Sequence, residues 1–214
     1  METFGQSYGY ILYRTSLTGP IKGDLVVKDV RDYAQVYVNG VFAGALDRRL
    51  GQDTLAIEST AARAGLDILV ENSGRVNFQK VLREERKGIT SSVSLGGTAL
   101  RGWDVFTLPM SSTPHPSYGS NALDGPAFYQ GTFTLKATGD TFLDLRGWGK
   151  GTVWVNGHHL GRFWSIGPQQ TLYVPGPWLK KGTNEVVVFD LERPTRTTMS
   201  GLSKPVLDQA APPR

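Results

Sequence analysis

The amino-acid sequence predicts an all-β fold made of two tandem domains of the same type. The main observation is a hairpin pattern that occurs twice, as VYVNGVFAG at residues 36–44 and as VWVNGHHLG at residues 153–161. In each copy, alternating apolar residues lead to Asn-Gly, and both of these residue types tolerate the positive φ angles that a type I′ turn requires. The similarity continues downstream, where residues 54–57 and 66–71 resemble residues 171–174 and 185–190.

The composition supports the same fold class. The 214 residues include 26 glycines and 12 prolines, with short β-rich runs between them, which favours a sandwich or a barrel. A chain of this length hides roughly 70% of its unfolded surface on folding. Cysteine is absent, which excludes a disulfide framework, a thiolate metal site and a cysteine nucleophile.

The first domain is predicted to span residues 1–110. Its opening strand covers residues 8–15 and ends before Gly19-Pro20, and a loop at residues 29–34 leads into the first hairpin. One helical turn is predicted at residues 60–65, where a glycine would end it. The remaining strands are predicted from alternating or continuous apolar runs at residues 23–27, 54–57, 66–70, 89–95 and 103–108.

The second domain is predicted to span residues 127–195. A stretch rich in Ser, Pro, Gly and Asn at residues 111–126 predicts a linker before it. Its strands are predicted at residues 128–135 and 141–145, followed by the second hairpin and its downstream strands. After Arg193-Pro194 the β periodicity is lost, so residues 196–214 are expected to form a C-terminal tail, loose at its end.

Charge and hydropathy exclude several classes of function. The net charge is +4, but the densest basic cluster, residues 83–87, is half acidic, whereas a nucleic-acid site usually concentrates Lys and Arg on one face. No apolar run approaches the ~20 residues needed to span a bilayer. Residues 1–6 do not form the basic and apolar segment of a signal peptide. We therefore expect neither nucleic-acid nor membrane binding, and the compartment stays open.

A long string in the second domain carries a specific resemblance. Residues 144–151 read DLRGWGKG, residues 153–164 read VWVNGHHLGRFW, and the string continues through residue 185. It closely resembles the C-terminal, galactose-binding-like jelly roll of family 35 β-galactosidases. In the first domain, residues 5–15, 36–44 and 71–78 resemble the all-β domain that precedes that jelly roll. The resemblance covers nearly the whole chain and implies two tandem jelly-roll β-sandwiches.

The resemblance also implies a missing catalytic part. Retaining glycosidases of this kind use two glutamates, one as nucleophile and one as acid/base, and in the resembled family both lie in an N-terminal (β/α)8 barrel. Such a barrel needs roughly 200 residues or more, and the present sequence begins at the first all-β domain. No catalytic residue is therefore carried over. The chain is expected to be a C-terminal fragment of a longer enzyme or a free-standing accessory protein.

One loop of the first domain has an expected role by resemblance. In the family, the loop at residues 71–78 leans toward the open end of the barrel, and its last aromatic residue helps to shape the acceptor side of the active site. This implies that Phe78 contacts the sugar beyond galactose, and that Arg75 and Asn77 hold the domain to the barrel. Asn72 belongs to the same acceptor-side or barrel-facing loop. Many relatives have tyrosine at this position, so phenylalanine keeps the stacking surface without the hydroxyl group. In an isolated chain, the same loop would simply be exposed.

Tryptophans are the main candidates for direct sugar binding, because an aromatic face stacks on the apolar face of a pyranose. Trp148, Trp164 and Trp178 lie near predicted turns, where the ligand loops of a sandwich gather. Polar residues nearby in the sequence complete the candidate set: Arg146, Asn156, His158 and Arg162. The alternative interpretation is that these aromatic residues pack in the core or against the missing barrel. Trp103 and Trp154 are expected to be core residues.

Carboxylates offer a less favoured catalytic hypothesis. Asp140 and Asp144 are four positions apart and Asp190 and Glu192 are two positions apart, which places each pair on one strand face. A retaining site would need two carboxyl groups about 5 Å apart, so Asp144, Asp190 and Glu192 are the candidates for a small glycosidase. The alternative is that they are solvated charges or strand-end caps.

Metal and cofactor sites are not expected. His158 and His159 are adjacent in a predicted strand and therefore point to opposite faces, which makes a poor chelating pair, and His115 lies in the linker. No phosphate loop, nucleophile elbow or dinucleotide fingerprint is present.

Three functions follow as hypotheses. The first hypothesis is that the chain is a non-catalytic region of a β-galactosidase. This region would support the barrel of the same or a companion chain and bind galactosides weakly. The alternatives are a stand-alone carbohydrate-binding protein and a small glycosidase with its own activity. An apolar surface left by a missing barrel would also promote self-association.

Overall fold

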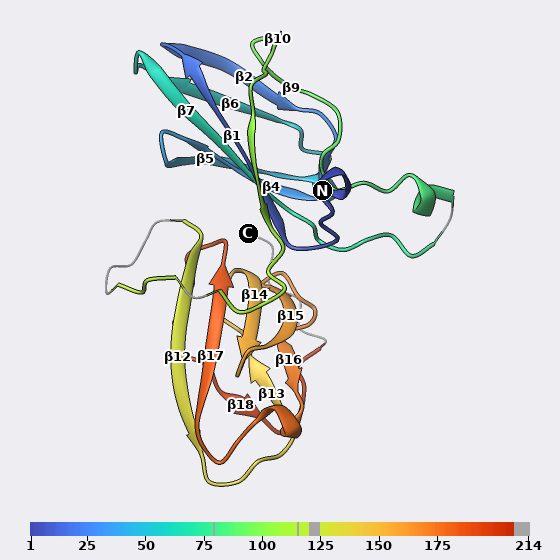
Figure 1. Cartoon of the computed structure of the whole chain (residues 1–214), viewed down its shortest axis with the longest axis vertical. Coiled ribbons are helices and arrows are strands. Elements are labelled where there is room, and N and C mark those ends of the chain that lie inside the picture. Colours follow the sequence, from blue (N-terminus) through green and yellow to red (C-terminus); the bar gives the residue numbers. More distant parts are fainter. Residues whose placement is uncertain (79, 115, 120–124, 208–214) are drawn as a thin grey trace. The chain divides into compact units, whose positions relative to one another are not determined.

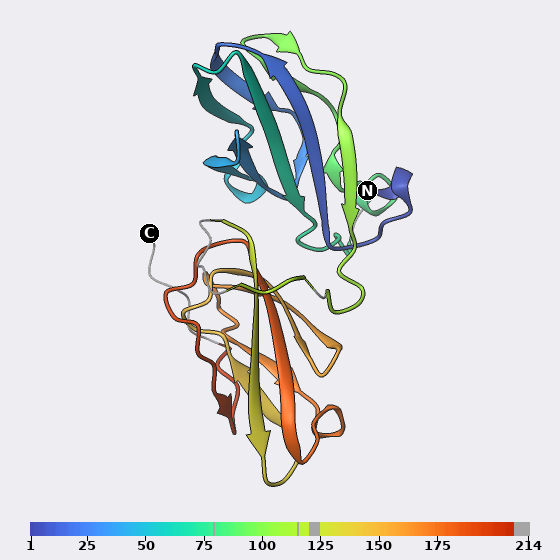
Figure 2. The ribbon, with the colours of Figure 1, turned by 60° about the vertical axis from the view of Figure 1, so that its left-hand side comes forward.

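The computed structural model describes residues 1–78, 80–114, 116–119 and 125–207. The chain divides into two compact units, Met1–Met110 and Ser111–Arg214, each of which is an antiparallel β-sandwich of the jelly-roll type (Figures 1 and 2). His115, part of the predicted linker and the predicted loose end after residue 207 lie outside the described residues. No helix in the described ranges is long and apolar enough to cross a membrane.

The first unit contains a five-stranded and a four-stranded sheet. The five-stranded sheet has the order β11-β1-β7-β4-β5, with strands at Asp104–Leu108, Tyr10–Thr18, Arg63–Glu71, Tyr33–Val38 and Val41–Asp47. The four-stranded sheet has the order β10-β9-β2-β6, with strands at Thr98–Ala99, Val93–Leu95, Ile21–Val27 and Thr54–Ser59. A small pair joins β3 (Val30–Arg31) to β8 (Gly88–Ile89), and 3₁₀ helices occur at Glu2–Phe4, Arg48–Leu50 and Lys80–Arg83.

The second unit repeats this plan with fewer strands. Its larger sheet has the order β12-β17-β14-β15, with strands at Ala127–Leu135, Gly182–Asp190, Lys150–Val155 and His158–Trp164. Its smaller sheet has the order β16-β13-β18, with strands at Thr171–Val174, Thr141–Asp144 and Gly201–Leu202. A 3₁₀ helix occupies Gly176–Trp178.

Both predicted Asn-Gly hairpins are confirmed. Asn39 and Gly40 have φ angles of 53° and 77°, and Asn156 and Gly157 have φ angles of 49° and 84°, as a type I′ turn requires. Each hairpin also has a bulge two residues before the end of its first strand, between Val36 and Tyr37 and between Val153 and Trp154. The repeat seen in the sequence is therefore a repeat of backbone geometry.

The asparagine of each hairpin also ties the turn to the neighbouring strand. The Asn39 amide N–H donates to the Gly65 carbonyl at 2.8 Å, and the Asn39 side-chain oxygen accepts from the Gly65 N–H at 2.8 Å. Asn156 makes the same two bonds with Glu185, both at 3.0 Å. A side chain that replaces a ladder partner in this way satisfies backbone groups at the end of a sheet.

Each unit has a hydrophobic core of its own between its two sheets. The first core includes Ile11, Leu25, Val36 and Ile68, all fully buried. The second core includes Val153, Val188, Phe163 and Trp148. Trp154 is also buried, as expected, and Trp103 packs against the first core as a partly buried residue.

Four local predictions differ from the structure. The predicted loop at residues 29–34 contains β3 and the first residues of β4, which begins at Tyr33. The predicted helical turn at residues 60–65 is absent, because Arg63 already begins β7 and the strand pairing with β1 extends to it. The predicted strand at residues 89–95 is divided, with β8 ending at Ile89 and β9 beginning at Val93. Residues predicted to form a tail contribute β18, which pairs with Phe142 and Leu143 of β13. Two residues of pairing are too short to leave a periodic signal in the sequence.

Candidate functional site

The loop that follows β7 in the first unit is held at its base and exposed at its tip. Asn72 is buried, donates its side-chain amide to the Ser7 carbonyl at 2.9 Å and accepts from the Gly74 N–H at 3.0 Å. The Arg75 guanidinium donates to the Ser7 carbonyl at 3.1 Å and pairs with Glu2 at 2.6 Å. Asn77 is exposed, and Phe78 is 75% exposed. We call residues 72–78 the Phe78 loop.

The Glu2 carboxylate strengthens this base electrostatically. Burial by itself would raise the pKa of Glu2, but backbone N–H groups of Glu2 and Lys87 and the Arg75 guanidinium hydrogen-bond to the carboxylate and lower its pKa to about 2. Glu2 is therefore ionised at any pH near neutrality, which keeps the ion pair with Arg75 intact.

A buried charged network lies beneath the Phe78 loop. The Lys87 ammonium, 2% exposed as a residue, contacts both carboxylate oxygens of Asp32 at 2.9 and 2.7 Å and the Glu85 carboxylate at 2.7 Å. Arg48 joins the same two carboxylates at 2.8 and 3.2 Å. The Asp32 carboxylate also contacts the Phe78 loop directly, since it accepts a hydrogen bond from the Ser73 N–H at 2.9 Å.

The sequence does not reveal this network. Residues 83–87 read only as a mixed-charge surface cluster, yet Glu85 and Lys87 are buried. Asp32 and Arg48 are distant in the sequence, and neither belongs to a motif. Burial of Lys and Glu is rare unless the groups are paired, and pairing across the fold leaves no local pattern.

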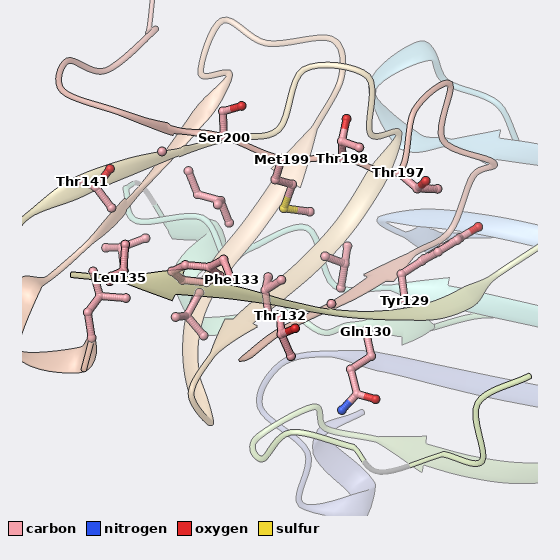
Figure 3. A pocket seen from close by; sticks show the side chains of 18 of the residues that line it. Tyr129, Gln130, Thr132, Phe133, Leu135, Thr141, Thr197, Thr198, Met199 and Ser200 are labelled. Carbon is pink, nitrogen blue, oxygen red and sulfur yellow. The ribbon is translucent and has the colours of Figure 1, made fainter. Parts of the chain in front are cut away.

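The second unit contains an open pocket of about 600 Å³. It lies between β12 and the segment of residues 197–201, and its inner wall is formed by core side chains of the sandwich (Figure 3). Tyr129 and Trp148 meet edge to face in this wall, with ring centroids 5.2 Å apart. Thr132, Thr141, Thr197, Thr198 and Ser200 also line the pocket, although the side chains of Thr132, Thr198 and Ser200 point away from the space between β12 and residues 197–201 (Figure 3).

Trp148 is the predicted sugar-binding residue that lines this pocket. It is 3% exposed and belongs to the second core. Its indole Nε1 is buried without a hydrogen-bond partner among the described residues. A buried indole N–H usually has a partner, so Trp148 departs from the usual arrangement.

Three other predicted sugar-binding residues meet at the tip of the second hairpin. The His158 ring stacks on Trp178 with centroids 4.6 Å apart and planes 13° apart. The Asn156 side chain donates to the Trp178 carbonyl at 2.8 Å and to the Asn184 side-chain oxygen at 2.7 Å. We call Asn156, His158 and Trp178 the hairpin-tip cluster.

The remaining candidates lie apart from this cluster. Trp164 covers the buried Lys150 ammonium, which stands 3.7 Å from the ring centroid. Arg146 is exposed and bound to Asp144, and Arg162 is exposed on β15. The seven predicted residues are therefore distributed over several places in the unit.

Each of the aspartates considered for catalysis is held by neighbouring groups. Asp144 is buried and accepts from the Arg146 backbone and guanidinium groups at 2.8–3.0 Å, with Arg196 also near. The hydrogen bond from the Arg146 side chain is the main reason that the pKa of Asp144 falls to about 2. Asp140 accepts from the Gly176 N–H at 2.8 Å, and such hydrogen bonds lower its pKa.

Asp190 has the opposite shift. It is fully buried and accepts from the N–H groups of Gly149, Lys150 and Glu192 at 2.8–3.0 Å. Burial raises the pKa of Asp190 to about 6, although these hydrogen bonds act in the opposite direction. The three N–H donors come from Gly149 and Lys150 at the start of β14 and from Glu192 just after β17, so this carboxylate caps backbone groups at strand ends.

Histidines do not form a chelating pair. His158 stacks on Trp178, whereas His159 is half-buried, meets the Thr152 hydroxyl at 2.5 Å and contacts Trp154 edge to face. Burial lowers the pKa of His159, so the ring is neutral at pH 7. Within the described residues, no group of three His, Cys, Asp or Glu side chains is placed to hold a metal ion.

Comparison with known families accounts for both units. A family model described as "Beta-galactosidase, first all-beta domain" matches residues 1–109, and one described as "Beta-galactosidase, galactose-binding domain" matches residues 126–184. The two matches together cover both hairpins, the Phe78 loop and the hairpin-tip cluster.

Known proteins similar to the chain are much longer than it is. A "Beta-galactosidase" of Xanthomonas manihotis is 49% identical over 81% of this chain and 29% of its own length. "Beta-galactosidase-1-like protein 2" of Homo sapiens is 40% identical over 87% of this chain and 30% of its own length. The chain thus spans about 30% of the length of these relatives. Among solved structures, a lectin from Pleurotus ostreatus in complex with GalNAc covers 86% of this chain and 69% of its own, with 14% identity and a TM-score of 0.31.

Proposed function

Because this chain belongs to the β-galactosidase family, we propose that it is the non-catalytic C-terminal region of a family 35 β-galactosidase. In this role the chain supports a catalytic (β/α)8 barrel of the same or a companion polypeptide. It also shapes the acceptor side of the barrel's active site through the Phe78 loop. The substrate class is a β-galactoside whose second sugar meets Phe78.

The construction of the Phe78 loop is the observation that carries this proposal. A large aromatic side chain that is 75% exposed is not explained by packing within its own unit. Its loop is nevertheless anchored at both Asn72 and Arg75 and rests on a buried ionic network. A rigid base with an exposed aromatic tip suits a surface that stacks on a sugar.

The state of the carboxylates supports a non-catalytic role. A retaining site needs one carboxylate free to attack an anomeric carbon and one carboxylic acid free to donate a proton. Asp144 is held by arginines and Asp190 by three backbone N–H groups, so both carboxylates are engaged in contacts within their own unit. Their opposite pKa shifts follow from these structural surroundings.

Hydrolysis of a chromogenic β-galactoside by the purified chain tests the proposal. We expect no turnover above the background of a matched preparation that lacks the chain. Turnover that remained with the chain after purification to constant specific activity would mean that these residues hold an active site. Asp144→Asn, Asp190→Asn and Glu192→Gln would then identify the carboxylates responsible.

The hairpin-tip cluster favours weak galactoside binding as a second function. His158 and Trp178 form a stacked pair at an exposed turn, beside the amide of Asn156, and aromatic faces with polar neighbours bind pyranose rings. Titration with lactose, followed by NMR, should shift the Trp178 indole signal in the wild-type chain and leave Trp178→Ala without a saturable response. Equal responses in Trp178→Ala and in the exposed control Tyr173→Ala would place sugar binding elsewhere.

A further inference from the structure

The pocket of the second unit lies beside a strand edge that is open within the described residues. β12 is the last strand of its sheet in the order β12-β17-β14-β15 and pairs with β17 along its whole length, from Ala127 to Leu135. The pocket is lined by this strand on one side and by residues 197–201 on the other (Figure 3). An open strand edge next to an apolar pocket is suited to binding one more strand.

The internal repeat shows what occupies the corresponding place in the first unit. Val36 and Val153 hold the same position in the two hairpins, and they pair with Ile68 and Val188. Ile68 and Val188 pair in turn with Tyr13 of β1 and Tyr129 of β12. β1 and β12 are therefore equivalent strands, and their tyrosines are equivalent residues.

In the first unit, the far edge of β1 is covered by β11. Tyr13 pairs with Val105 of β11, and the Tyr13 ring meets the ring of Trp103, just before β11, edge to face at 6.4 Å. Val105 and Trp103 pack against the first core, and a smaller pocket of about 390 Å³ remains there. In the second unit, no strand of the described residues covers the equivalent edge of β12, and the larger pocket opens beside that edge.

The chemistry of the second pocket fits a strand. Tyr129, Phe133 and Met199 give it apolar walls (Figure 3). A peptide strand supplies what such a site needs, namely apolar side chains on alternate residues for the pocket and backbone groups that hydrogen-bond to the edge of β12.

We propose that β12 and its pocket bind an extended peptide segment with apolar side chains on alternate residues, supplied by another part of a longer β-galactosidase polypeptide. The added strand takes the place that β11 has in the first unit and closes the second sandwich. The source of the segment rests on the proposed function, since this chain spans only 29–30% of the length of the relatives. The ability of the pocket to bind such a strand does not depend on catalysis.

A peptide with the sequence of residues 102–108, GWDVFTL, is the probe, since this segment contains β11 and its preceding tryptophan. The peptide carries fluorescein at its N-terminus and an amide at its C-terminus, so that neither end is charged. It is titrated with the full 214-residue chain, and binding is followed by fluorescence anisotropy. We expect saturable binding, and weaker binding of a scrambled peptide. No binding of GWDVFTL up to its solubility limit would overturn the proposal.

Variants locate the peptide on the chain. Met199→Asp places a charge in the pocket and should weaken binding at least tenfold, whereas Ser203→Asp, exposed on the same segment and outside the pocket, should leave binding unchanged. Ala137→Asp, on an exposed loop at the pocket rim, replaces Met199→Asp if circular dichroism shows that the latter is unfolded. Equal binding by the pocket variant and Ser203→Asp would refute the assignment.

Competition experiments distinguish the proposed peptide from other occupants of the pocket. Displacement of the peptide by lactose would make the pocket a sugar site, and peptide-induced dissociation of a dimer, measured by analytical ultracentrifugation, would make the occupant a second copy. Either result would overturn the proposal. Turnover by the isolated chain would refute the proposed function and leave this binding experiment unaffected.

Discussion

At the scale of single residues, the stability of the first unit depends on buried charged side chains. Lys87 is held by Asp32 and Glu85, and Arg48 bridges the same carboxylates at the surface side. The pKa of Glu85 is lowered despite its burial because Lys87 and Arg48 hydrogen-bond to the carboxylate. Removing one partner from such a group leaves an uncompensated charge in the interior.

Lys87→Met should therefore destabilise the first unit by about 3–5 kcal/mol, because two carboxylates lose their buried cation. Urea unfolding at pH 7 measures this change in the free energy of unfolding. Lys22→Met is the matched control, since Lys22 pairs with Glu58 at 3.2 Å on the exposed surface, and it should change stability by no more than about 1 kcal/mol. Similar losses in the two variants would contradict the role given to the network.

Asp190 makes a pH-dependent contribution of unusual sign. Its pKa is about 6 in the folded chain against an ordinary value of 3.8, so the folded state holds this proton more tightly than the unfolded state does. Its contribution to stability is present below pH 4 and is lost as the pH rises to 6, by about 3 kcal/mol in total. Asp144 and Glu2, with pKa values of about 2, change in the opposite direction below pH 4.5.

Comparing wild type with Asp190→Asn isolates this effect. The difference in unfolding free energy, wild type minus variant, should fall as the pH rises from 4 to 6 and stay constant above pH 7. Chemical unfolding at several pH values measures the difference, because the other titrating groups are common to both proteins. Parallel stability curves would show that Asp190 does not titrate in this range.

At the scale of elements, the two hairpins are the best-determined parts of the fold. Each combines an Asn-Gly turn, a bulge and an asparagine that bonds to the adjacent strand. The second asparagine has more bonds than the first, because Asn156 also donates to Trp178 and to the fully buried Asn184. Local turn chemistry and tertiary contact therefore support the same geometry.

Asn156→Ala should destabilise the second unit by about 2–3 kcal/mol. The alanine would be strained at a φ of 49°, where non-glycine residues are unfavourable by roughly 1–2 kcal/mol, and buried groups would lose partners. Asn156→Gly relieves the strain but not the lost hydrogen bonds, so its unfolding free energy should lie between those of wild type and Asn156→Ala. Thermal or urea unfolding measures the order of stability of the three proteins. Equal stability of the two variants would assign the whole loss of unfolding free energy to hydrogen bonding.

At the scale of the whole molecule, the chain is two sandwiches built on one plan, each with its own core. The first carries a rigid loop with an exposed aromatic tip, and the second carries an open pocket beside an edge strand. Both features are surfaces without a counterpart in their own unit, and the proposed function assigns such a counterpart to the Phe78 loop.

The Phe78 loop can be tested in a chimeric enzyme, in which this chain replaces the matching region of the Xanthomonas manihotis relative. Phe78→Ala should raise KM for a galactose-containing disaccharide roughly 5-fold, because a stacking contact of about 1 kcal/mol is lost. Phe78→Tyr should keep the wild-type value. Leu50→Ala, at another exposed apolar side chain, is the control, and an unchanged KM in Phe78→Ala would remove the loop from the acceptor side.

The sequence alone determined the fold class, the tandem repeat and the turn geometry, because these follow from short-range chemistry. Alternation, Asn-Gly pairs and glycine–proline breaks act within a few residues, so they are readable without the fold. Family resemblance identified the Phe78 loop by its position in a long string of matching residues.

Only the tertiary structure decided which polar residues are structural and where a pocket lies. The network of Asp32, Lys87, Glu85 and Arg48 joins residues up to 55 positions apart, and Asp144 and Asp190 show their role only through the backbone groups that they bind. β18 and the edge of β12 depend on pairing between distant segments. Such contacts are set by the folding of the chain as a whole, since burial and long-range partners leave no periodic mark in the sequence.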